Sequence, residues 1–182
     1  MATIILRPNG AGDVTGLTPD PAVDNYLNVD EAEADDDTTD NGISYEGPGS
    51  ADEYDLYALE NSSDLGTINS VTVYARSYLM AGGAGFAGYS GYTKIKTGGT
   101  EYEGEVNTTG GWTTYNTEYT TNPKTSSAWT WDEVNSLQAG VRITGGGESG
   151  GGTKATQVYV EVDYEAGAST YTKSVSVTFG GS

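Results

Sequence analysis

The chain has 182 residues, the length of one ordinary domain, and its 26 acidic and 8 basic residues give it a net charge of −18. Nucleic-acid phosphates and anionic lipids bind surfaces of the opposite charge, so the sequence predicts neither nucleic acid nor a membrane as a partner. Because the chain has no histidine and no cysteine, it lacks the commonest general base, a thiolate nucleophile, disulfides and the usual zinc ligands.

The composition favours strands and turns over helices, because glycine (27 residues) and tyrosine (14 residues) are both abundant. The first residues, MATIILRPNG, contain no basic region followed by a small-residue cleavage site, so they do not resemble a signal peptide. We therefore expect synthesis and folding in a cytoplasm.

The first predicted element is a strand over residues 3–7, which Pro8, Asn9 and Gly10 should end. Turn-forming residues follow, and residues 29–40 then read VDEAEADDDTTD; we call this stretch the acidic segment. Alternation of apolar and polar residues predicts strands in the remainder of the chain. These strands cover residues 54–60, 68–80, 92–97, 101–108, 110–121, 140–145 and 156–164.

One helix of about two turns is predicted within residues 129–140. Asp132 is its expected N-cap, Val134 and Leu137 share one face, and Gly140 should end it.

These short strands and closely spaced turns predict an all-β fold, an antiparallel jelly-roll-like β-sandwich with one short helix. The sandwich should cover residues 1–165, and residues 166–182 should form a linker and an extension strand.

The extension strand is half apolar. Its apolar face consists of Tyr171, Val175, Val177 and Phe179. Such a strand could add to its own sandwich, pair with a neighbouring subunit, or begin a longer element. We prefer docking in an assembly, so this face is the expected assembly surface.

The acidic segment allows three interpretations: a solvated loop, a hard-cation site and a catalytic site. In an extended chain Asp35 and Asp37 point the same way and could converge on calcium, whereas Asp36 points away. The residue order does not match the EF-hand calcium loop. We expect a solvated loop, no catalytic residues and no cofactor, with calcium at Asp35 and Asp37 as the alternative.

Several aromatic residues are candidates for glycan binding or subunit contacts, because exposed rings bury a large area at a low entropic cost. The alternative is that they belong to the core, with tryptophans at the ends of the sandwich. These candidates are Trp112, Tyr115, Tyr119, Phe86 and Tyr89.

Several stretches resemble uncharacterised proteins of tailed viruses, proviruses and environmental viral sequences. The similar stretches are TIILRPNGAGD, VDE…DDDTTD, DLYAL, INSVTVYAR, NP…AWTWDEVNSLQAGVR and TQVYVEVDY, with TYTKSVSV resembling the start of a variable extension. Asp40 stands where that group often has tyrosine. The resemblance implies a jelly-roll-like sandwich and a structural role in a virion.

We therefore expect a virion-surface protein, made in a host cytoplasm, that decorates a capsid by protein–protein assembly. Its partners would be further copies of itself, with a trimer as the first candidate, and a major capsid or other virion protein. Two alternatives remain open: a glycan-binding module of a tail fibre or spike, and a subunit of an extracellular filament joined by strand exchange.

Overall fold

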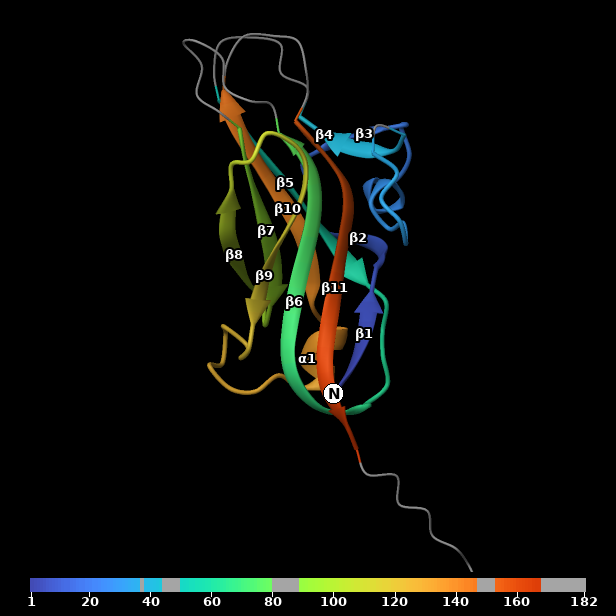
Figure 1. The fold of residues 1–182 in the computed structure, drawn as a ribbon, viewed down its shortest axis with the longest axis vertical. Helices are drawn as coiled ribbons and strands as arrows, with labels where there is room; N and C mark the ends of the chain where they lie inside the picture. Colours follow the sequence, from blue (N-terminus) through green and yellow to red (C-terminus); the bar gives the residue numbers. More distant parts are fainter. Residues whose placement is uncertain (37, 44–49, 80–88, 147–152, 168–182) are drawn as a thin grey trace, which may run out of the picture.

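The computed structural model describes residues 1–36, 38–43, 50–79, 89–146 and 153–167, which form two antiparallel sheets packed face to face (Figure 1). The predicted all-β sandwich is therefore confirmed. The first sheet has the order β3-β4-β11-β6-β9, with β1 also paired to β11, and the second has the order β2-β5-β10-β7-β8.

The first sheet consists of β1 (Ala2–Leu6), β3 (Thr18–Asp20), β4 (Asp40–Gly42), β6 (Gly66–Leu79), β9 (Gly111–Tyr119) and β11 (Lys154–Ala166). The second sheet consists of β2 (Pro8–Thr15), β5 (Ser50–Leu59), β7 (Ser90–Thr97), β8 (Thr100–Asn107) and β10 (Gln138–Gly146). Two short helices, η1 (Asn25–Asn28) and α1 (Trp131–Asn135), complete the described elements.

Eight of these strands have the connectivity of a jelly roll. The order β1-β11-β6-β9 faces the order β5-β10-β7-β8, and along these eight strands the chain changes sheet at every connection except the β7–β8 hairpin. The strands β2, β3 and β4 are inserted between the first two strands of this pattern.

The core lies between the two sheets. As the period-2 pattern of β11 predicts, Val158, Val160 and Val162 are fully buried, and they lie with Val71 and Val73 of β6 in one apolar cluster. Burial of a valine or leucine side chain contributes roughly 1.5–3 kcal/mol, so this interior supplies the main driving force for folding.

The first strand ends before Pro8 as predicted, but the turn-forming residues that follow begin a second strand. The chain leaves the first sheet after Leu6 and enters the second at Pro8, which begins β2. Proline is tolerated there because it is the first residue of a strand at the edge of its sheet. Gly12 lets β2 approach β5 closely, since a Cβ atom at this position would lie 2.3 Å from the Leu56 carbonyl oxygen.

The predicted helix exists but is shorter, and its N-cap is not Asp132. Thr130 caps α1, accepting a hydrogen bond from the Glu133 amide while the Glu133 carboxylate accepts one from the Thr130 amide. The helix ends at Asn135 because Gln138 already begins β10. Val134 and Leu137 are both buried, as predicted.

The first and the last strands of the sandwich, β1 and β11, lie side by side. Ala2 of β1 pairs with Tyr164 near the end of β11, and α1 lies at the same end of the sandwich (Figure 1). The chain leaves β11 at Gly167, whose amide donates to the Leu65 carbonyl. No helix of the described ranges is long and apolar enough to cross a membrane.

Candidate functional site: a groove beside the acidic segment

The acidic segment runs along β11, and some of its side chains, Glu33 among them, are exposed. The Val158 amide donates to the Val29 carbonyl over 2.9 Å, and the Gln157 side-chain amide donates to the Glu31 carbonyl over 2.8 Å. These bonds place the segment between β1 and β4 along the same edge of β11. Asp40 begins β4, and its carboxylate lies 2.8 Å from the ammonium group of Lys154.

Asp35 is engaged by neighbouring protein donors. Its carboxylate accepts hydrogen bonds from the Thr39 hydroxyl at 2.9 Å and the Thr156 hydroxyl at 2.8 Å. Asp37, its predicted partner in a calcium site, lies outside the described residues. Within those residues, no group of three or more acidic side chains is arranged to hold a metal ion.

The Thr39 hydroxyl also links Asp35 to Glu31. Its oxygen lies 2.8 Å from Glu31 Oε1 and 2.9 Å from Asp35 Oδ2, but one hydroxyl proton can serve only one of these carboxylates. Burial raises the pKa of Glu31, and the charges of Asp35 and Asp30 raise it further. Burial likewise raises the pKa of Asp30. If Glu31 is protonated, its own proton can be donated to the Thr39 oxygen while the Thr39 hydroxyl donates to Asp35.

The described residues among the aromatic candidates for glycan binding or subunit contacts lie in different surroundings. Tyr115 and Tyr119 of β9 pack against the core, and burial raises the pKa of both hydroxyls, that of Tyr119 to about 12. Tyr89 also packs against the core. Trp112 lies on the outward face of the first sheet, edge-on to Tyr78 with the ring centroids 5.6 Å apart.

Two other tryptophans occupy core positions, as the alternative interpretation predicted. Trp129 and Trp131 are 4% and 7% exposed, and the Trp131 indole N–H donates to the Gly66 carbonyl. Phe86 and the predicted assembly face lie outside the described residues, so their interpretation stays a prediction. That face consists of Tyr171, Val175, Val177 and Phe179.

Searches against models of known protein families and against curated proteins find no match.

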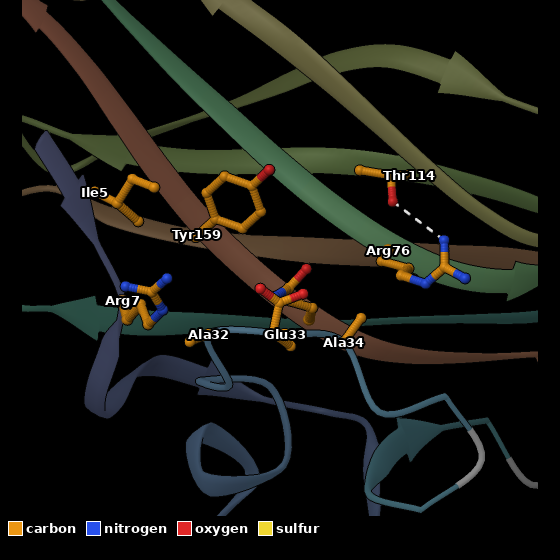
Figure 2. Close-up of a pocket in the computed structure, with 9 residues that line it drawn as sticks. Ile5, Arg7, Ala32, Glu33, Ala34, Arg76, Thr114 and Tyr159 are labelled. Atoms are coloured by element: carbon orange, nitrogen blue, oxygen red, sulfur yellow. Dashed lines mark hydrogen bonds between the residues drawn. The ribbon is translucent and has the colours of Figure 1, made fainter. Parts of the chain in front are cut away.

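A hollow of about 360 Å³ lies on the outward face of the first sheet, beside the acidic segment; we call it the outer groove (Figure 2). Ile5 of β1 and Arg7, two residues further along the chain, line one side, and residues 32–34 line another. Tyr159 of β11 and Arg76 of β6 supply the sheet side of the groove. The groove is therefore assembled from segments that are distant in the sequence.

Two arginines lie at opposite ends of the outer groove, with Glu33 between them (Figure 2). The Arg76 guanidinium is held by a two-pronged ion pair with Asp36, and it also donates to Thr114 over 3.3 Å. The hydrogen bond to Asp36 raises the pKa of Arg76, which stays charged. Arg7 differs, because its buried Nε has no hydrogen-bond partner among the residues that the structure describes.

A ring stack fixes the aromatic wall of the groove. Tyr159 packs parallel to Tyr74 of β6, with the ring centroids 4.6 Å apart and the ring planes within 8°. Because Tyr74 occupies the neighbouring space, the Tyr159 ring is positioned without any ligand. Neither tyrosine belongs to the aromatic set that the sequence singled out.

A buried polar cluster anchors the insertion that carries the acidic segment. Asp55 of β5 is fully buried, and its Oδ1 accepts from the amides of Gly16 at 2.7 Å and Leu17 at 2.9 Å. Its Oδ2 accepts from the Asn25 side chain at 2.6 Å and from the Tyr57 hydroxyl at 2.9 Å. Asn41 of β4 donates to the same hydroxyl and so ties the far end of the insertion to this cluster.

Several charges on the outward face of the second sheet are held in ion pairs between strands. Arg142 of β10 pairs with Asp52 at 2.7 Å and with Glu103 at 2.8 Å, and the hydrogen bond to Asp52 raises its pKa. Lys94 pairs with Glu101 at 3.2 Å. These contacts connect neighbouring strands and leave the outer groove as the stronger candidate for ligand binding.

Proposed function

We propose that this chain is a non-enzymatic structural protein of a virion that decorates a capsid by protein–protein assembly. The jelly-roll topology supports this, because double-sheet jelly rolls recur in capsid and lectin domains. The resemblance to proteins of tailed viruses and the net charge of −18 agree with a soluble, outward-facing module.

The observation that carries the proposal is the point at which the chain leaves the sandwich. All eight strand positions of the jelly roll are filled by residues before Gly167. In the sequence, the half-apolar segment 171–179 therefore follows a complete sandwich, and the last described residues of that sandwich lie beside the N-terminal strand. We propose that this segment pairs with a neighbouring copy or with the underlying shell by β-augmentation.

Analytical ultracentrifugation of the 182-residue chain tests the assembly step. We expect a small closed oligomer for the unmodified chain and a folded monomer for the chain that stops after Gly167. Val177→Asp should likewise give a monomer, because it places a charge on the apolar face of the segment. The matched control, Ser176→Asp, alters the opposite face and should leave the oligomer intact.

Co-sedimentation with purified particles of the encoding virus tests the capsid step. The unmodified chain should pellet with particles, and the shortened chain should stay in the supernatant. Equal binding of both chains would contradict the role given to segment 171–179. Open-ended polymers in the ultracentrifuge would favour the filament interpretation over a capsid decoration protein.

A further inference from the structure

We propose that the outer groove is a binding site for a neutral pyranose sugar at the end of a glycan chain. This inference goes beyond the assembly role, and it uses residues that lie apart from segment 171–179. The volume of about 360 Å³ falls at the lower end of the roughly 300–1,000 Å³ typical of small-molecule sites.

The polar groups of the groove match hydroxyl groups, which donate and accept hydrogen bonds at once. Arg7 offers only donors and Glu33 offers only acceptors, and Figure 2 shows both facing the same hollow. Thr114 accepts from Arg76 and retains its own hydroxyl proton as a donor. A sugar diol could accept from Arg7 while it donates to Glu33.

The unpartnered Nε of Arg7 points to a missing acceptor. A buried donor without a partner is costly, and ligand or water oxygens commonly satisfy such groups. The backbone of Arg7 is fixed because its amide donates to the Glu60 carboxylate and its carbonyl accepts from the Glu60 amide. These bonds hold the backbone that carries the guanidinium beside the groove.

Tyr159 supplies the apolar surface that a sugar ring requires. One face of a pyranose carries mainly C–H groups, and such a face packs on an aromatic ring. Because Tyr74 already holds the Tyr159 ring in a stack, the ring loses little freedom when a ligand arrives.

The charges around the groove favour a neutral ligand over an anionic one. The positive charges of Arg7 and Arg76 are balanced by Glu33, which lines the groove, and by Asp36, which pairs with Arg76. The remaining carboxylates of the acidic segment and the net charge of −18 repel anions. Phosphate, sulfate and carboxylate sugars are thus disfavoured.

A glycan array that carries neutral, sialylated and sulfated glycans tests the proposal with the 182-residue chain. We expect binding to a subset of neutral glycans, followed by titration calorimetry with the best of them. Tyr159→Ala, Arg7→Met and Glu33→Ala should each weaken binding about tenfold, which corresponds to about 1.4 kcal/mol.

Glu118→Ala is the matched control, since Glu118 is an exposed carboxylate on the same sheet that does not line the groove. It should bind like the unmodified chain. Glu33 is also exposed, so Glu33→Ala keeps the test valid even if Tyr159→Ala fails to fold. Absence of neutral-glycan binding, a preference for acidic glycans, or binding that Glu33→Ala and Tyr159→Ala leave unchanged would overturn the proposal. The chain that stops after Gly167 retains every groove residue, so loss of assembly and loss of sugar binding are separate results.

Discussion

Replacement of Asp55 by alanine should destabilise the protein far more than any exposed charge change. Asp55→Ala leaves the Leu17 amide and the Tyr57 hydroxyl without their hydrogen-bond acceptor. The Gly16 amide retains the Tyr54 carbonyl as its acceptor, whereas Asn25 keeps the Leu17 carbonyl for one amide hydrogen and loses the acceptor of the other. Three buried orphaned donors cost about 1–3 kcal/mol each, and the one lost hydrogen bond at Gly16 costs about 0.5–1.5 kcal/mol.

The expected loss is therefore about 4–10 kcal/mol, which is comparable with the roughly 5–15 kcal/mol that stabilises a whole domain. Urea unfolding at neutral pH, followed by the fluorescence of the buried Trp129 and Trp131, measures it. The matched control is Asp52→Ala, three residues earlier on the same strand. That carboxylate is 55% exposed and its ion pair with Arg142 should contribute less than about 1 kcal/mol.

Asp55→Asn serves if Asp55→Ala does not fold. It retains an oxygen for the Gly16 and Leu17 amides, but its amide group faces the donors of Asn25 and Tyr57, so its stability should fall between the other two variants. Equal unfolding midpoints for Asp55→Ala and Asp52→Ala would refute the reasoning.

Three further changes test individual contacts. The amide of Glu31→Gln can donate to the Thr39 hydroxyl oxygen, which leaves the hydroxyl proton for Asp35. This variant should therefore raise the free energy of unfolding at neutral pH by up to about 1 kcal/mol. The raised pKa of Glu31 means that the folded state binds the extra proton, so stability falls as pH rises from the unfolded pKa through the folded one. The benefit of Glu31→Gln should therefore vanish at acidic pH, and a pH-independent difference would contradict this account. The unmodified chain should lose stability as pH rises from about 10 towards 12, because burial raises the pKa of the Tyr119 hydroxyl to about 12. Tyr119→Phe has no hydroxyl to ionise, so its stability should fall less over this range; an unchanged alkaline unfolding curve would count against this. Thr130→Ala should cost about 1 kcal/mol in urea unfolding through loss of the α1 cap, whereas Ser136→Ala at the other end should cost less.

The sandwich could be predicted because its signal is local. Val158, Val160 and Val162 alternate with polar residues, and burial of every second side chain is sufficient to define a strand. The strand that begins at Pro8 could not be predicted in this way, since proline and glycine also mark turns. Only the position of β2 at the edge of a sheet makes proline acceptable there, and that position is a property of the fold.

The outer groove was beyond sequence reasoning for a similar reason. Arg7 and Tyr159 are far apart in the chain, and the pairing of β1 with β11 brings them to one side of the sheet. The sequence does not single out Asp55 either. In the sequence, an aspartate that becomes buried and accepts from four donors cannot be distinguished from any other aspartate in a strand. A strand of alternating residues does predict that Tyr159 faces outward, but not which neighbours surround it.

The sedimentation coefficient of the 182-residue chain, compared with that of the chain ending at Gly167, tests the proposed assembly most directly. The account predicts an oligomer that becomes a folded monomer when residues 168–182 are removed. A monomer in both cases, or the same oligomer in both, would contradict it.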